Sequence, residues 1–210
     1  MERERITISI KKEVLDKIDC VIDGMNIRNR SHAIESLSLK GLGQTQTKKA
    51  VILLGGNDAI KAVPSSRAIL KQLQESGFAK AFIAVGYLAE QIKKELGFGE
   101  EYDLDVRYSE KGEGSAGALK NLSEEFDQTF VVYNTKSTLD VSPDILLSFH
   151  QKHNFPASIF TNNLETNEGI YVFDSIVLNR IPDGFAMIED DLIPELIKAQ
   201  EVVFFPLAVN

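Results

Sequence analysis

The sequence predicts an α/β protein with a mostly parallel, mixed sheet, preceded by a small strand–helix–helix unit. Three observations predict it. Apolar strand patterns alternate with helical patterns over residues 50–210, as in βαβ units. One alternating strand and two helical patterns occupy residues 1–43. A polar stretch without apolar periodicity, at 44–49, separates the two parts. We therefore expect two domains joined by a linker.

Composition narrows the class of protein. The chain has 210 residues, of which 43% are hydrophobic and 26% are charged, and its formal net charge is −8. No segment approaches the roughly 18 consecutive apolar residues of a membrane span, and the N-terminus lacks the apolar core of a signal peptide. A single cysteine excludes an intrachain disulfide framework. These features predict a protein of the cytoplasm that does not enter membranes.

Charge is divided unevenly. Residues 1–49 carry ten Lys/Arg against seven Asp/Glu, and residues 50–210 carry thirteen against twenty-four. The first part therefore has a charge of +3 and the second −11, so only the first part is suited to a polyanion.

The first element is the alternating stretch RITISI at 5–10. A period of two places its apolar side chains on one face of a strand and its polar side chains on the other. The apolar set is Ile6, Ile8 and Ile10, and the polar set is Arg5, Thr7 and Ser9. We expect the apolar face to be core and the polar face to be exposed.

Two helices follow, over 11–25 and from Asn29 to Gly41. Asn29 or Ser31 can cap the second helix, and Gly41 can end it. A lone strand has two unpaired edges, and a unit this small is close to the limit of what one core can stabilise. Both problems disappear if two copies pair their strands, so we expect a homodimer or a higher oligomer.

Residues 4–42 resemble the ribbon-helix-helix family of DNA-binding dimers, through R-x-T-x-S-I in the strand and N-R-S-x-x-I at the second helix. The resemblance implies that a two-stranded ribbon enters the major groove of DNA. Its base-reading residues would be Arg5, Thr7 and Ser9, and its phosphate contacts would come from Asn29, Arg30 and Ser31. The alternative is a dimerisation arm whose polar strand face is only hydrated.

The long unit continues with strand patterns at 48–54, 79–85, 103–109 and 128–134, and helical patterns at 64–77, 87–97, 114–126 and 142–153. Later strand patterns lie at 156–160, 167–174 and 201–207, and a helical pattern at 190–200. We interpret the acidic residues 189–191 as the start of that helix. We interpret His150 and His153 as the end of a surface helix.

Two glycine-bearing turns follow strands of this unit. Gly55-Gly56 ends the first strand, where bare backbone can approach a nucleotide. The segment GEGSAGALK at 112–120 places small residues at a helix start, which suits a flat ring or an anion. Each signal alone is weak.

Residues 48–207 resemble the sugar-phosphate nucleotidyltransferases, which join a nucleoside triphosphate and a sugar 1-phosphate and release pyrophosphate. The matching motifs are A-V-I-L-x-G-G at 50–56, F-I-A-V-G-Y-L-A-E-Q-I at 82–92, G-S-A-G-A-L at 114–119 and G-I-Y-V-F-D at 169–174. The resemblance implies a Rossmann-like fold and a nucleotide site at the carboxyl ends of the strands.

The sequence departs from this family at its catalytic motifs. The family's loop of the type x-G-T-R-L-x-P is missing after Gly56, which shortens the reach of Lys61. The family's strand pattern V-L-N-G-D, whose aspartate binds Mg²⁺, corresponds here to residues 132–136, and Lys136 replaces the carboxylate. We therefore expect neither catalytic residues nor a metal site.

Lys136 has two interpretations, as a hydrated residue on a loop or as a cation that pairs with the phosphates of a bound nucleotide or nucleotide sugar. The second implies a ligand without turnover and without another cofactor. The ligand-binding residues would be Gly55, Gly56, Asn57, Lys61, Gly114, Ser115, Gly117, Lys136 and Asn167.

Taken together, these patterns predict a DNA-binding transcription regulator whose larger domain is a pseudoenzyme of the nucleotidyltransferase type. Two alternatives remain open. One is a divergent sugar-phosphate nucleotidyltransferase, oligomerised by its N-terminal arm, that binds metal through Asp58, Asp140 or a carboxylate of a partner chain. The other is an assembly protein that binds neither DNA nor a ligand.

Overall fold

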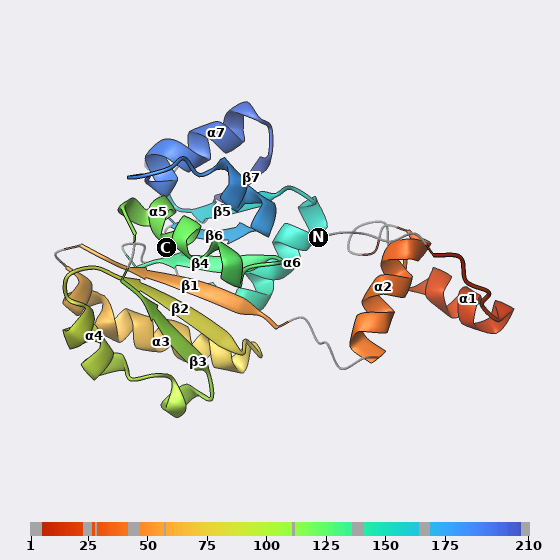
Figure 1. The fold of residues 1–210 in the computed structure, drawn as a ribbon, viewed down its shortest axis with the longest axis horizontal. Helices are drawn as coiled ribbons and strands as arrows, with labels where there is room; N and C mark the ends of the chain where they lie inside the picture. The colour runs from red at the N-terminus through yellow and green to blue at the C-terminus, as the bar shows by residue number, and fades with distance from the viewer. Residues whose placement is uncertain are drawn as a thin grey trace. The chain divides into compact units, whose positions relative to one another are not determined.

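The computed structural model describes residues 6–22, 27, 29–41, 47–56, 58–110, 112–135, 141–163 and 169–206. The chain divides into two compact units, Met1–Gln46 and Thr47–Asn210, and each is described by itself (Figure 1). No helix in the described ranges is long and apolar enough to cross a membrane.

The first unit contains helix α1 (Lys12–Cys20) and helix α2 (Arg30–Gly41). Asn29 caps α2, because its side-chain Oδ1 accepts a hydrogen bond from the backbone N–H of His32 at 3.0 Å. That bond satisfies one of the free N–H groups of the first helical turn. Ile18 and Ala33 are buried and form the centre of this unit.

The strand expected at 5–10 is not formed over the residues of it that the structure describes. The described residues 6–10 belong to no strand of the sheet, and Arg5 lies outside the described residues. Ile6 is 71% exposed and Ile8 50% exposed, so the expected core face is open to solvent. A strand is stabilised by backbone hydrogen bonds to a neighbouring strand, and no described segment of the chain forms such a neighbour for residues 6–10. The ribbon-helix-helix domain is therefore not shown.

The second unit is built on a seven-stranded sheet with the order β3-β2-β1-β4-β6-β5-β7. Strands β3, β2, β1 and β4 are mutually parallel, β6 is antiparallel to β4 and β5, and β7 is parallel to β5. The strands are β1 (Lys49–Leu54), β2 (Lys80–Val85), β3 (Asp105–Ser109), β4 (Phe130–Asn134), β5 (Ala157–Thr161), β6 (Gly169–Phe173) and β7 (Val202–Pro206). The expectation of a mostly parallel, mixed sheet is confirmed.

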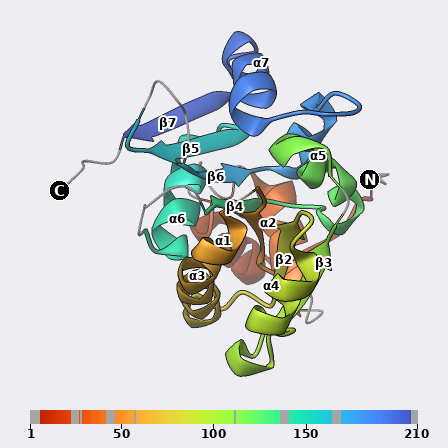
Figure 2. The same cartoon turned by 90° about the vertical axis from the view of Figure 1, so that its left-hand side faces the viewer.

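Helices cover both faces of this sheet. One face packs against α3 (Val63–Glu75), α4 (Ala89–Leu96) and α6 (Pro143–His153). The other packs against α5 (Gly114–Asn121), the π-helical segment η5 (Ile188–Leu192) and α7 (Ile193–Lys198). Figure 2 shows the sheet between these two layers. The short 3₁₀ segments are η1 (Ala59–Ala62), η2 (Glu100–Tyr102), η3 (Ser123–Glu125) and η4 (Ser175–Arg180).

Burial on both faces explains the apolar strand sequences. In β1, Ile52 contributes to the core under α3, and its neighbours Val51 and Leu53 contribute to the core under α5. Successive side chains of a strand point to opposite faces, so a strand covered on both sides needs apolar residues at every position. The central strands therefore read as continuous apolar runs.

The parallel strands all end at one edge of the sheet. Residues that follow β1, β2, β3 and β4 lie there, together with the amino end of the antiparallel strand β6 at Gly169. In open α/β sheets, ligands bind at the carboxyl ends of the strands. This edge is where a site is expected.

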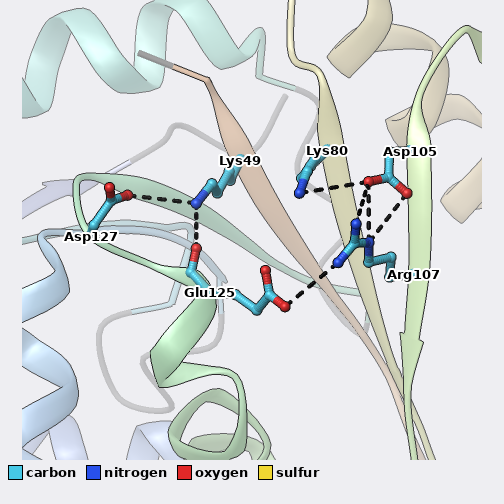
Figure 3. Close-up of polar contacts among 6 residues, drawn as sticks. All are labelled: Lys49, Lys80, Asp105, Arg107, Glu125 and Asp127. Atoms are coloured by element: carbon cyan, nitrogen blue, oxygen red, sulfur yellow. Dashed lines mark hydrogen bonds and ion pairs between the residues drawn. The ribbon is translucent and has the colours of Figure 1, made fainter. Parts of the chain in front are cut away.

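The opposite edge of the sheet carries a set of paired charges (Figure 3). Lys49 contacts Asp127 at 3.5 Å and donates to the backbone carbonyl of Glu125. Arg107 contacts Asp105 at 3.0 Å and the carboxylate of Glu125 at 3.6 Å. Lys80 also contacts Asp105, at 3.7 Å. Each cation has an acidic partner, so this edge has the character of a surface ion network, whose pairs contribute about 0–1 kcal/mol each.

Candidate functional site

A pocket of about 370 Å³ lies at the carboxyl ends of β1, β2 and β4, roofed by the start of α5 and by the segment that precedes η5. Its lining contains glycines, apolar side chains and a few polar groups. They are Gly55, Gly56, Gly86, Gly112 and Gly114; Leu53, Ala84, Val85, Ala118, Phe185 and Met187; and Ser115, Asn134 and Glu189. Mostly apolar walls with few polar groups are typical of ligand sites.

Glu189 brings a carboxylate into this pocket. Its Oε1 accepts hydrogen bonds from the Asn134 side-chain amide and from the Tyr171 hydroxyl, both at 2.8 Å. Its Oε2 lies 3.4 Å from the Ser115 hydroxyl oxygen. Burial, together with the negative charge of Glu189, raises the pKa of the Tyr171 hydroxyl far above its usual value, so that this hydroxyl keeps its proton and donates it.

Helix α5 begins in a way that the sequence analysis did not foresee. The backbone N–H groups of Ala116 and Gly117 donate to the carbonyl of Ala186, at 2.9 and 3.2 Å. A Cβ on Gly114, whose φ is +82°, would lie 2.2 Å from the same carbonyl oxygen. The small residues at this helix start thus admit the segment before η5. The expectation that these N–H groups hold an anion is wrong for Ala116 and Gly117, because a protein carbonyl occupies them.

The turn after β1 is open on its ligand side. A Cβ built on Gly55 or Gly56 would meet nothing within 4 Å, and Gly56 has a φ of +86°, which favours glycine. Lys61 does not line the pocket; its Nζ contacts the Asp58 carboxylate at 2.7 Å. That pair lowers the pKa of Asp58 and raises that of Lys61. The turn leaves bare backbone, not a side-chain cation, at the mouth of the pocket.

Of the predicted ligand-binding residues, Gly55, Gly56, Gly114 and Ser115 come together in the pocket. Gly117 is packed against the carbonyl of Gly184, to which a Cβ would lie 3.3 Å away. The remaining predicted residues, Asn57, Lys136 and Asn167, lie outside the described residues, as does Asp140.

Sequence reasoning missed Asn134, Phe185 and Glu189 as pocket residues. The acidic run 189–191 does begin a helical segment, since Asp191 accepts a hydrogen bond from the backbone N–H of Met187 at 2.7 Å. Glu189 itself contacts residues 18 to 74 positions away in the sequence. No local pattern marks such a contact.

The described residues do not fit a divalent metal ion by themselves. Within the described ranges, no three His, Cys, Asp or Glu side chains lie close enough to hold one. Among the described lining residues Glu189 is the only carboxylate, and donors already occupy its Oε1. Mg²⁺ needs several oxygen ligands, and the described lining residues alone do not supply them.

A His, a Ser and an Asp also lie together elsewhere in the second unit, but they stabilise the fold. His150 contacts the Ser158 hydroxyl through Nδ1 at 2.9 Å and the Asp174 carboxylate through Nε2 at 3.3 Å. His150 is 3% exposed and Ser158 is fully buried, so no substrate reaches them. His150 and His153 do lie at the end of a helix, α6, as interpreted, but the side chain of His150 is buried. A separate hollow of about 490 Å³ is lined by residues of η1, α3 and α4.

Of the polar residues predicted to contact DNA, Arg30 and Asn29 have partners within the chain, and Thr7, Ser9 and Ser31 are exposed. Arg30 forms a two-pronged ion pair with Asp19, at 2.7 and 2.8 Å, which neutralises its charge. Asn29 caps α2, and Ser31 is exposed in its first turn. Thr7 and Ser9 are exposed on residues 6–10. Arg30 is therefore already paired and is not a free cation for a phosphate.

No protein-family model matches the chain. A UTP–glucose-1-phosphate uridylyltransferase of Synechocystis is 25% identical over 183 residues, covering 64% of this chain and 47% of the relative. The catalytic subunit beta of mannose-1-phosphate guanylyltransferase of Drosophila melanogaster is 26% identical over 169 residues, covering 63% and 46%. The chain thus spans about half the length of the curated relatives that it matches.

Solved structures share the fold. A putative glucose-1-phosphate thymidylyltransferase from Bacillus anthracis superposes with a TM-score of 0.63 at 17% identity, covering 77% of this chain and 87% of that chain. HddC from Yersinia pseudotuberculosis gives 0.60 at 15% identity, covering 76% and 90%. The chain therefore has an α/β, Rossmann-like nucleotidyltransferase fold.

The prediction of a DNA-binding transcription regulator is wrong. The relatives and the structural neighbours point to sugar-phosphate nucleotidyltransferases, which was the alternative. Neither comparison supports DNA as a partner. The N-R-S motif misled the prediction, because helix capping accounts for Asn29 and the ion pair with Asp19 accounts for Arg30.

Proposed function

We propose that the chain is a divergent sugar-phosphate nucleotidyltransferase, which joins a nucleoside triphosphate to a sugar 1-phosphate and releases pyrophosphate. The observation that carries the proposal is the pocket at the carboxyl ends of β1, β2 and β4, with open backbone at Gly55 and Gly56. A nucleotide-sized site at this edge is the arrangement that this fold offers to nucleotides.

The lining divides the pocket into chemically different parts. Apolar side chains and glycines at the ends of β1 and β2 suit the flat faces of a base. The glycine turn after β1 lets backbone N–H groups approach phosphates, because no side chain intervenes. The relatives and neighbours act with uridine, guanosine or thymidine nucleotides by their names, so the proposal covers nucleoside triphosphates as a class.

Phosphoryl chemistry of this kind depends on positioning and on neutralising charge. Among the described residues, Lys61 is the cation nearest in sequence to the glycine turn, and its Nζ pairs with Asp58 while both side chains are about four-fifths exposed. An exposed pair of this kind is weak and can exchange partners. Lys61 can therefore turn from Asp58 to a bound phosphate.

The test is release of pyrophosphate from panels of nucleoside triphosphates and sugar 1-phosphates in the presence of Mg²⁺. Gly55→Trp introduces a large side chain at a residue that lines the pocket, and nothing lies within 4 Å of the position of its Cβ. Ile197→Trp, at a half-exposed position on α7 outside the pocket, is the matched control. We expect activity in the wild type and the control and none in Gly55→Trp.

Two outcomes contradict the proposal in different ways. If the wild type binds a nucleotide but releases no pyrophosphate with any combination of triphosphate and sugar 1-phosphate, the pocket binds nucleotides but the chain does not catalyse the reaction. A folded chain that binds no nucleotide would contradict both the nucleotide site and the reaction.

We further propose that the first unit joins two copies of the chain. Ile6 and Ile8 alternate with polar residues and are exposed, and no described segment of the chain forms a strand partner for residues 6–10. Antiparallel pairing with a second copy would form a two-stranded ribbon and cover these side chains. Sedimentation should give a dimer or a larger species for the wild type and a smaller one for Ile8→Lys. A wild-type monomer would contradict this proposal.

A further inference from the structure

The carboxylate of Glu189 is held in a fixed position inside the pocket. Asn134 at the end of β4 and Tyr171 on β6 both donate to its Oε1 at 2.8 Å. Tyr171 is fully buried, and its hydroxyl also accepts a hydrogen bond from the backbone N–H of Gly169 at 3.2 Å. Side chains held by buried partners are preorganised for binding. Glu189 is therefore a ready acceptor.

The two carboxylate oxygens of Glu189 differ in whether they can accept a further hydrogen bond. A carboxylate oxygen has two lone-pair directions, and both directions of Oε1 are taken. The contact of Oε2 with the Ser115 hydroxyl, at 3.4 Å, is longer than an ordinary O–H···O bond of about 2.5–3.0 Å. Ser115 also accepts from the backbone N–H of Ile188 at 2.8 Å, which fixes it in place. Oε2 is thus the oxygen that can still accept a strong hydrogen bond.

The position of Glu189 relative to the strands indicates which part of a nucleotide it meets. The sheet order at this edge is β2-β1-β4-β6, and neighbouring strands lie about 4.8 Å apart. The apolar lining residues Ala84 and Val85 belong to β2, and Leu53 belongs to β1. Glu189 is hydrogen-bonded to Asn134 on β4 and Tyr171 on β6. Strand β4 lies two strand spacings from β2 in the sheet. A base placed against β2 and β1 has its ribose directed toward β4.

Charge excludes the phosphates from the same position. A carboxylate repels phosphate oxygens and accepts from hydroxyl or N–H donors. The open backbone of Gly55 and Gly56 offers the phosphates a separate place, at the end of β1. Glu189 therefore meets a hydroxyl or N–H donor, and for a nucleotide bound alone that donor belongs to the nucleoside.

We infer that Glu189 is a specificity-determining residue whose Oε2 accepts a hydrogen bond from a ribose hydroxyl of the bound nucleotide. The inference rests on the proposed function, since it assumes a nucleotide in this pocket. It adds that the protein discriminates against nucleotides that lack that hydroxyl. A hydrogen bond to a charged acceptor, once lost, leaves a desolvated carboxylate oxygen unpaired, which weakens binding by about tenfold or more.

The experiment is titration calorimetry of the full-length chain with the four common ribonucleoside triphosphates. The base that binds most tightly is then compared in its ribo, 2′-deoxy and 3′-deoxy forms. The proteins are the wild type, Glu189→Gln and the control Asp190→Asn, which removes a charge from the neighbouring, exposed residue outside the pocket. If Glu189→Gln is less stable, Glu189→Asp is measured beside it, because it keeps the charge but withdraws the carboxylate by one methylene.

We expect the wild type and Asp190→Asn to bind the ribonucleotide about tenfold or more tightly than one deoxy form. In the Glu189 variant, that ratio should fall to about threefold or less, which a double-mutant cycle between residue and hydroxyl measures directly. The triphosphates carry no second sugar, so the ratio reports on the ribose alone.

Three results would overturn the inference. The wild type could bind all three forms equally, or the ratio could persist in the Glu189 variant. The variant could instead change the ranking of bases and leave the ratio unchanged, which would place the carboxylate against the base. All three require that a nucleotide binds, so they leave the pocket of the proposed function in place. A folded wild type that binds no nucleotide overturns both.

Discussion

The Tyr171 hydroxyl holds the pocket residue Glu189 in place, and its energetic role can be worked from the structure. It is fully buried, donates to the Glu189 carboxylate at 2.8 Å and accepts from the backbone N–H of Gly169 at 3.2 Å. Tyr171→Phe removes one oxygen and leaves the ring in place. We expect this substitution to destabilise the second unit.

Two losses set the magnitude. A hydrogen bond to a charged group contributes about 1.5–3 kcal/mol, and the Gly169 N–H would be left buried without its hydroxyl partner, at a cost of about 1 kcal/mol or more. Glu189 keeps Asn134 and so stays partly paired, which limits the effect. The free energy of unfolding should fall by about 2–4 kcal/mol, which lowers Tm by roughly 4–16 °C for a unit of this size.

Urea denaturation and thermal unfolding followed by far-UV circular dichroism would measure the change. Tyr108→Phe is the matched control, because the Tyr108 hydroxyl makes a neutral hydrogen bond to the Gly97 carbonyl at 2.6 Å in a half-buried position. We expect about 1 kcal/mol for that variant. If Tyr171→Phe costs no more than Tyr108→Phe, the reasoning that Glu189 is held by a strong charged hydrogen bond is refuted.

Two further predictions concern the fold. Gly114→Ala should lower the free energy of unfolding by about 2–4 kcal/mol in urea denaturation, because φ is +82° and the new Cβ would overlap the Ala186 carbonyl. Gly86→Ala, which meets nothing within 4 Å, should change it by less than about 1 kcal/mol, and equal losses would contradict the packing argument. Burial raises the pKa of Tyr108 to about 12. The folded state then holds this proton more tightly than the unfolded chain, whose tyrosine pKa is about 10, so stability present below pH 10 should fall as the pH rises toward 12. Urea midpoints at stepped pH should show a shallower fall for Tyr108→Phe, and an unchanged slope would argue against it.

The alternation of strands and helices in the second unit could be predicted because its cause is local. A strand covered on both faces must be apolar at successive positions, as Val51, Ile52 and Leu53 are. The first unit shows the limit of the same reasoning. The alternation of Ile6 and Ile8 predicts an apolar face that packs against another element, but no described part of the chain buries these two side chains.

The pocket could be predicted only in part, because a glycine can be required either by an approaching ligand or by an approaching segment of the chain. Gly55 and Gly56 are open to a ligand, whereas Gly114 and Gly117 are small because another segment of the chain approaches them. Both situations require the absence of a Cβ, so the sequence alone does not separate them. Glu189 escaped prediction for a related reason. Its partners are distant in sequence, and an acidic residue at the start of a helix already has an ordinary explanation.

The bond between the Ala186 carbonyl and the N–H groups at the start of α5 has a consequence for biosynthesis. Ala186 leaves the ribosome 70 residues after Ala116, which at 5–20 residues per second is an interval of about 4–14 s. During that interval the first four parallel strands can assemble, but the start of α5 lacks its acceptor and the pocket lacks its wall. If the pocket binds a nucleotide as proposed, the nucleotide can stabilise only a chain that has been synthesised past Glu189, because Phe185, Met187 and Glu189 belong to the lining.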